Sequence, residues 1–258
     1  MEENHEKLLI SHLTLRKTIG WLGMLLPFAL IASNFLLNEF DLLNSPTLID
    51  KICSKPYVAD NIIKPSISHY YYSAVGEIFT GTISAVSLFM FCYRGHKNRK
   101  HEFGLSDQVL TNIIGLSALG IVIFPTSSPE CITDNIRTFM SSRFSGTIHL
   151  VMAAIFFVSL SFMSIINFRR TKDVHKFGTE FKHKVILVCG ISMLICIFII
   201  FIYSNFIEYK YDWLDRLNPV FWLEAVALIF FGICWMIKGQ VDFLYLYKKF
   251  KLNASNSK

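Results

Sequence analysis

Residues 185–207 read VILVCGISMLICIFIIFIYSNFI, which is 23 consecutive positions without a charged side chain. A bilayer core is about 30 Å thick and an α-helix rises about 1.5 Å per residue, so roughly 20 apolar residues are needed to cross it. Lipid offers no hydrogen-bond partner to the backbone, so this stretch must satisfy its amides within itself, although β-branched residues dominate it. We therefore expect one membrane-spanning helix here.

Five further segments have the same character, with at most one carboxylate in each. They are residues 18–38, 72–93, 108–126, 145–168 and 217–237. The whole chain agrees with this pattern, because 53% of its 258 residues are hydrophobic and only 17% are charged, against about 25% in soluble domains. Such a composition is unsuited to a water-soluble enzyme, a disordered chain or a nucleic-acid module. The expected fold class is all-α, a polytopic membrane protein with a bundle of six transmembrane helices.

The Lys and Arg residues are distributed unequally between the connections. Those before the first span, after the last span and in the second and fourth connections number 18, against 7 in the odd-numbered connections. Cytoplasmic loops carry the excess of Lys and Arg. This places both termini in the cytoplasm, an arrangement that requires an even number of spans, and six satisfies it. The formal charge of +6 then reports topology rather than an anionic partner.

The chain divides accordingly into three parts. Residues 1–17 form a cytoplasmic N-terminal segment, residues 18–237 a single membrane domain, and residues 238–258 a basic cytoplasmic tail. The first span exceeds the roughly 7–15 residues of a signal-peptide core, so we expect it to be retained as an anchor. We expect the protein in the inner membrane of a bacterial cell, with membrane lipids as partners and without nucleic acid or a cofactor. A homo-oligomer or an unidentified protein partner is compatible with the sequence.

Cys53 and Cys131 fall in the first and third outer connections, whereas the other four cysteines lie within or at the end of spans. An oxidising compartment on the outer side would allow these two residues to form a disulfide. Two free thiols in the outer connections are the alternative interpretation.

Three ionisable residues enter the predicted spans, and the topology places all three near the outer surface. Counted from the outer ends of their helices, Glu77 lies about 8 Å deep, His149 about 6 Å and Glu224 about 9 Å. Charges within a membrane are costly, so they usually face a cavity or a partner. Similar depths on the second, fourth and sixth spans predict that these side chains converge. Gly81, four residues after Glu77, would allow another helix to approach closely.

The connection before the second span adds hydroxyl, imidazole and phenol groups at the same level, in the order Pro65-Ser66-Ile67-Ser68-His69-Tyr70-Tyr71-Tyr72. The candidate polar pocket consists of five residues, namely Ser68, His69, Glu77, His149 and Glu224. Two histidines and two carboxylates could ligate zinc, but no pair has the spacing that places two ligands on one helical face. We therefore expect no metal. The alternatives are snorkelling or protonation of each carboxylate and, for His149, a hydrogen bond to a neighbouring carbonyl.

Sequence motifs for common enzyme chemistries are absent. No P-loop, GxGxxG, GxSxG or CxxC sequence is present, so nucleotide, acyl-serine and thiol-redox chemistry have no motif behind them. No catalytic residue is identified, and the sequence leaves enzyme activity undecided while favouring its absence.

Several short motifs resemble those of a loose group of six-span membrane proteins, the FRAG/DRAM/SFK group with its bacterial DUF-type relatives. The resemblance covers about residues 19–168. It is carried by Pro65-Ser66-Ile67-Ser68 before the second span, Gly115-Leu116, Gly120 and Phe124-Pro125 in the third, and Ile148-His149 with Phe156-Phe157 in the fourth. Eukaryotic members are linked to lipid remodelling of GPI anchors, to autophagy and to plasma-membrane lipid organisation. The resemblance implies a lipid-related role for the candidate polar pocket.

The expected function is the binding or modification of a lipid or glycolipid from the outer-leaflet side. A small transporter or proton-coupled carrier that uses the same acids is the first alternative. The apolar fifth span and the lack of an acid at mid-membrane argue against the continuous polar path that transport requires. A structural or assembly protein without catalysis is the second alternative.

Overall fold

The computed structural model describes residues 2–39, 62–93, 105–127, 141–169, 177–208 and 210–256. Every regular element in these residues is helical, and no strand occurs among them. The predicted all-α class is therefore confirmed for the described chain. Four helical stretches are long and apolar enough to cross a membrane, namely Thr14–Leu37, Arg143–Arg169, Glu180–Ile207 and Pro219–Gly239.

Six long helices make up most of the described residues. They are α1 (Glu2–Glu39), α3 (Gly76–Cys92), α4 (Asp107–Ile123), α5 (Ser142–Ile165), α6 (Phe177–Ile202) and α8 (Pro219–Asn256). Four short elements join them, namely the 3₁₀ helices η1 (Ile67–Tyr72) and η2 (Asn167–Arg169), the π-helical turn η3 (Tyr203–Ile207) and the single turn α7 (Asp212–Asp215).

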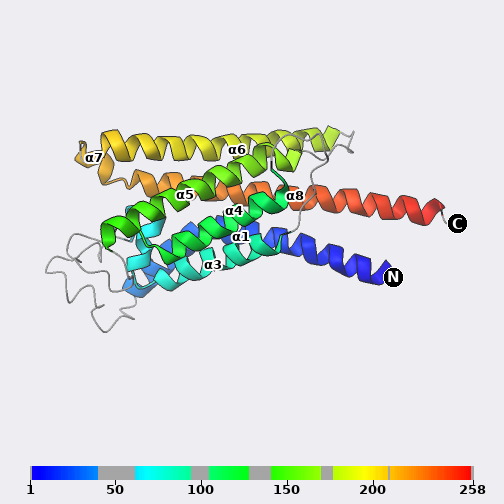
Figure 1. Ribbon diagram of the computed structural model, residues 1–258, viewed down its shortest axis with the longest axis horizontal. Coiled ribbons are helices and arrows are strands. Elements are labelled where there is room, and N and C mark those ends of the chain that lie inside the picture. Colours follow the sequence, from blue (N-terminus) through cyan, green and yellow to red (C-terminus); the bar gives the residue numbers. More distant parts are fainter. Residues whose placement is uncertain are drawn as a thin grey trace.

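The six long helices run alongside one another (Figure 1), and their contacts with one another close into a ring. Each packs against the next in the order α1, α3, α4, α5, α6 and α8, and α8 packs against α1. Both termini lie at the same end of the bundle, beyond which α1 and α8 project. We name this the terminal end, and the opposite end, which carries residues 62–75, the loop end.

The helices α1 and α8 cross at a pair of glycines. A Cβ atom on Gly20 would lie 2.9 Å from the backbone oxygen of Gly232, and one on Gly232 would lie 2.6 Å from the oxygen of Gly20. A larger residue at either position would separate the helices, and small residues are what allows such an approach in membranes. The first and last helices therefore meet backbone to backbone where they close the ring.

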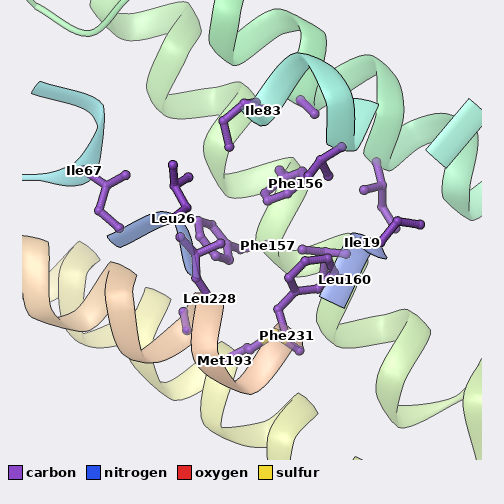
Figure 2. Packing of buried hydrophobic residues seen from close by; sticks show 14 of the residues in the cluster. Ile19, Leu26, Ile67, Ile83, Phe156, Phe157, Leu160, Met193, Leu228 and Phe231 are labelled. Carbon is purple, nitrogen blue, oxygen red and sulfur yellow. The ribbon is translucent and has the colours of Figure 1, made fainter. Parts of the chain in front are cut away.

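The middle of the bundle is apolar both inside and outside. Figure 2 shows Leu26, Phe157 and Phe231 within the buried cluster that fills the ring. On the outside, Leu88 is 65% exposed and Leu150 is 64% exposed. Leaving apolar surface in water costs about 25 cal/mol per Å², and soluble monomers rarely expose large apolar patches. The described helices therefore suit a protein embedded in a membrane.

The helices match the predicted spans in position but not in their ends. Helix α3 begins at Gly76 rather than at residue 72, because Tyr72 ends η1 and the chain turns before α3 starts. A Cβ at Gly76 would lie 2.6 Å from the Tyr71 oxygen, so this close return of the chain requires glycine. Helices α3 and α4 contain 17 residues each. Helices α1 and α8 contain 38 each and extend into the predicted N-terminal segment and tail.

Candidate functional site

The loop end is closed by residues 62–75, which include η1. Ser66 caps η1, since its side-chain oxygen accepts a hydrogen bond from the His69 backbone N–H at 3.3 Å. Serine is a favoured cap because its hydroxyl satisfies an amide that the first helical turn leaves without a partner. Pro65 precedes the cap and has an extended-chain preference that suits a helix start. The local sequence therefore accounts for the short helix that carries Ser68 and His69.

Two long helices hold this segment through its backbone, and a tyrosine side chain of the segment binds the chain that follows a third helix. The carbonyl of Ile62 accepts hydrogen bonds from the Tyr70 hydroxyl at 2.7 Å and from the Asn34 amide of α1 at 3.1 Å. The carbonyl of Pro65 accepts one from the Phe221 N–H of α8 at 3.1 Å. Tyr72 donates to the Thr126 carbonyl, beyond the end of α4, at 2.6 Å. Residues 62–72 are thus fixed against α1, α8 and the residues that follow α4 rather than free at the bundle end.

Ser68 and His149 lie in direct contact at the loop end. The Nε2 atom of His149 is 2.8 Å from the Ser68 hydroxyl, and its Nδ1 atom is 2.8 Å from the carbonyl oxygen of Phe124. A carbonyl can only accept, so Nδ1 carries the proton and Nε2 accepts a hydrogen bond from the serine. Both side chains are buried, Ser68 at 9% and His149 at 4% exposed. The predicted alternative for His149, a bond to a neighbouring carbonyl, is present together with the serine contact.

His69 is the second imidazole of this end and lies close to the first. Its Nδ1 atom is 2.6 Å from the Ser66 hydroxyl. Burial lowers the pKa of His69 from 6.5 to about 4, and the nearby His149 is the second cause. His69 is therefore neutral at pH 7, and the loop end contains two histidines, each in contact with a serine hydroxyl.

Glu224 joins this group through the backbone. Its Oε2 atom accepts a hydrogen bond from the N–H of Ile67 at 2.6 Å, and its side chain is half-buried. Ile67 is adjacent to Ser68, so the carboxylate of α8 holds the backbone next to the serine. The role that this contact supports is positioning of η1 rather than contact with a ligand.

Glu77 does not share the buried surroundings of Ser68 and His149. It lies exposed in the first turn of α3. Gly81 is exposed as well, and a Cβ atom there would meet nothing within 4 Å. The expectation that another helix packs closely at Gly81 is therefore wrong, because this side of α3 faces away from the bundle.

Two further predictions concern thiols and metals. Cys53 and Cys131 lie outside the described residues, so the predicted disulfide stays a prediction. Within the described part of the chain, no three His, Cys, Asp or Glu side chains come together in a way that could hold a metal ion. The sequence expectation about metals likewise stays a prediction for the whole chain.

A second polar cluster, which the sequence did not predict, lies at the terminal end. The guanidinium of Arg16 donates to the Tyr93 hydroxyl at 3.1 Å and lies 5.1 Å from the centre of that ring. The Asn167 amide donates to Asp107 at 2.7 Å. The ammonium of Lys238 donates to the Phe168 carbonyl at 3.3 Å. The three charged side chains are nearly buried, with Arg16 at 7%, Asp107 at 5% and Lys238 at 4% exposed.

The position of Lys238 and Arg16 on their helices could have indicated this burial. Lys238 follows the fully buried Trp235 by three residues, and Arg16 precedes the buried Ile19 by three. Residues three apart share a helix face, so each cation lies on the face that packs inward. By sequence, both count only among the Lys and Arg residues that set the topology. Ser106 does cap α4, since its hydroxyl accepts from the Val109 N–H at 3.3 Å.

No protein-family model, curated protein or solved structure matches the chain. The resemblance to the FRAG/DRAM/SFK group therefore remains an expectation, and the site is argued from its own geometry.

Proposed function

We propose that the chain is an integral membrane protein with six spans and both termini in the cytoplasm. Four stretches are long and apolar enough to cross a membrane. Helices α3 and α4, with 17 residues each, measure about 25 Å, which is at the short limit for a spanning helix. Their place in the ring between α1 and α5 supports counting them as spans. In this arrangement the loop end is the outer end.

The loop end, in this proposal, binds or modifies a lipid or glycolipid from the outer-leaflet side. The observation that carries it is the contact between the Ser68 hydroxyl and the Nε2 atom of His149 at 2.8 Å. The Ser68 hydroxyl is hydrogen-bonded to an imidazole, and a carbonyl holds the other nitrogen of that ring. Such a hydroxyl can serve in two ways. It can bind the hydroxyl and ester oxygens of a headgroup, or it can act as a nucleophile activated by a general base. The implied family role in lipid metabolism agrees with this choice of ligand.

The experiment compares lipids that remain bound to the purified protein, measured by mass spectrometry, and the lipid composition of the expressing membrane. Ser68→Ala removes one hydroxyl from the pair, and His149→Gln removes the base. Ser73→Ala is the matched control, because its hydroxyl in the same segment donates to the Tyr70 carbonyl at 2.7 Å. We expect the first two variants to lose a bound or modified lipid that the Ser73 variant retains. Identical lipid profiles in all three variants would refute the proposed site.

Transport is the weaker candidate on this geometry. A carrier needs polar groups along the whole path, whereas Phe156, Phe157 and Leu160 in the middle of α5 are buried in the apolar cluster between the two polar ends (Figure 2). Proton-coupled uptake in proteoliposomes would reverse this ranking. An assembly role would be favoured if the Ser68 and His149 variants changed neither lipids nor function and a stoichiometric protein partner was recovered by crosslinking.

A further inference from the structure

Three basic side chains gather at the terminal end where α5, α6 and α8 meet. Arg169 ends η2, directly after the last turn of α5, His183 lies near the start of α6, and Lys238 lies on α8. Helix α6 packs against both η2 and α8. The Lys238 ammonium donates to the carbonyl of Phe168, the residue before Arg169, at 3.3 Å. The three side chains therefore come from three elements that are in mutual contact.

The charges that act on His183 are both positive. Lys238 and Arg169 are the charged groups with an electrostatic effect on its ring. The Nε2 atom of His183 is buried and has no hydrogen-bond partner among the described residues. Buried ring nitrogens are normally hydrogen-bonded, and one that is not calls for an explanation. A negatively charged ligand would explain it, because it would accept from the imidazole and compensate the neighbouring cations.

Two carboxylates of the described residues, Glu180 and Asp107, need to be compared as partners for the Nε2 atom of His183. Glu180 is three residues before His183 on α6, but its side chain is exposed. Asp107 acts electrostatically on Lys238, as Arg16 also does, and it accepts a hydrogen bond from Asn167. Neither Glu180 nor Asp107 is among the groups that act electrostatically on the His183 ring. In the part of the chain that the structure describes, the charged groups that act on His183 are therefore only the basic residues Lys238 and Arg169.

All three residues lie at the margin of an apolar stretch, at one level of the bundle. Arg169 ends the stretch Arg143–Arg169, His183 is close to the start of Glu180–Ile207, and Lys238 is next to the end of Pro219–Gly239. The margin of a membrane span lies at the level of the lipid headgroups. Arg169 is exposed and Lys238 is buried, so the group reaches from the surface inward between helices. Basic pockets of this kind on the cytoplasmic side bind anionic headgroups.

We propose that His183, Lys238 and Arg169 form a binding site for a phosphate anion at the terminal end, distinct from the loop-end site. The ligand is the phosphate of an anionic phospholipid headgroup or a free phosphate, which offer the same oxygen atoms to these donors. An arginine and a lysine on phosphate oxygens form charge-assisted hydrogen bonds, which are about twice as strong as neutral ones. The imidazole Nε2–H supplies a third donor. This inference does not depend on the function proposed for Ser68 and His149.

The test uses the purified full-length chain in a zwitterionic detergent, titrated separately with phosphatidylglycerol, phosphatidylcholine and inorganic phosphate while the unfolding temperature is recorded. Phosphatidylglycerol should raise this temperature at lower concentration than phosphatidylcholine does. If inorganic phosphate reproduces the effect at the same concentration, the ligand is free phosphate. If only phosphatidylglycerol does, the ligand is a lipid. No difference between either phosphate probe and phosphatidylcholine would overturn the proposal.

Two variants and one control locate the site. Arg169→Gln removes an exposed charge and His183→Leu removes the buried donor. Each should weaken the titration midpoint about fivefold, which corresponds to roughly 1 kcal/mol per basic group near a membrane surface. Arg143→Gln is the matched control, because Arg143 is exposed at the other end of the same helical stretch. If His183→Leu does not fold, Arg169→Gln alone decides. A midpoint for Arg169→Gln equal to that of Arg143→Gln would overturn the proposal.

Discussion

The two ends of the bundle both bury polar side chains, but they satisfy them in different ways. At the loop end the groups in contact are two histidines and serine hydroxyls, and the carboxylate of Glu224 binds a backbone amide. At the terminal end formal charges are buried, and aromatic rings lie beside them, Tyr93 at Arg16 and Phe168 at Lys238. A buried charge occurs at the loop end as well, since Lys64 is 6% exposed, but there the contacts between side chains are hydrogen bonds of serine and histidine, whereas at the terminal end they involve charged groups.

This difference suits the two sides that the proposed topology assigns. A neutral site of hydroxyls and imidazoles can recognise sugar and ester oxygens by direction. A basic site at the cytoplasmic surface faces anionic lipid headgroups. Their negative charge attracts the basic side chains over a distance that salt screening limits. Substitutions at the terminal end test whether charge holds it, and substitutions at the loop end test whether hydrogen bonds hold it.

The largest effect is expected for Asp107→Ala at the terminal end. This carboxylate is buried and binds the Asn167 amide, and it acts electrostatically on Lys238. Its removal would leave a buried amide and nearby buried cations without a carboxylate. Removing one partner from a buried charged group costs about 3–5 kcal/mol, so we expect the free energy of unfolding to fall by about 3 kcal/mol. Reversible unfolding in detergent, followed by helical circular dichroism, measures it.

Asp212→Ala provides the control for that measurement. Asp212 is exposed in the first turn of α7, and surface substitutions usually change stability by less than about 0.5 kcal/mol. Equal losses for the Asp107 and Asp212 variants would show that charge does not hold the terminal end.

An intermediate effect is expected for Glu224→Ala at the loop end. The substitution would leave the Ile67 N–H without its acceptor at 2.6 Å. An unsatisfied buried donor costs about 1–3 kcal/mol, so we expect a loss of about 2 kcal/mol. Glu77→Ala, which removes the same chemical group at a similar predicted depth but from an exposed position, should change stability by less than about 0.5 kcal/mol. If both variants lose the same stability, the distinction between the two carboxylates is wrong.

The contrast between Glu77 and Glu224 shows what sequence alone can predict in a membrane protein. Depth along a span follows from counting residues, and it placed both acids near one end. Counting residues does not show which side of the helix a residue faces, because the face toward lipid is as apolar as the face toward the core. On α3 the buried residues Phe79, Ile83 and Met90 define one face, and Leu88 on the other face is apolar too. The usual amphipathic pattern of a soluble helix is therefore absent.

The fold was predictable to a greater extent than the site. Absence of charge located the apolar helices, because lipid forces backbone amides to bond within their own segment. Their ends were less predictable, since they depend on local contacts such as the close approach of Gly76 to the Tyr71 carbonyl. At the site, Ser68 and His149 were chosen by chemistry and depth, and the structure places them in contact. Arg16 and Lys238 were missed because charges at span ends usually remain solvated.

The smallest effect is the part of the pH dependence that comes from His69 at the loop end. Burial, with a smaller contribution from His149, lowers the pKa of His69 from 6.5 to about 4. Between these values the unfolded chain binds a proton that the folded chain does not, so stability must fall as the pH decreases from 6.5 toward 4. Because the ring is only half-buried, we expect a modest loss of about 1 kcal/mol by pH 5.

Unfolding temperatures at pH 7 and pH 5 measure this effect in the wild type and in His69→Gln. Glutamine retains a side-chain amide that can bond the Ser66 hydroxyl, but it does not titrate. The wild type should therefore lose more stability than the variant between these two pH values. Asp107→Ala, which alters the terminal end, should retain the wild-type pH dependence because His69 is unchanged. A pH dependence that persists in His69→Gln and disappears in Asp107→Ala would assign acid sensitivity to the terminal end, and would show that the loop end does not owe its stability to neutral histidines.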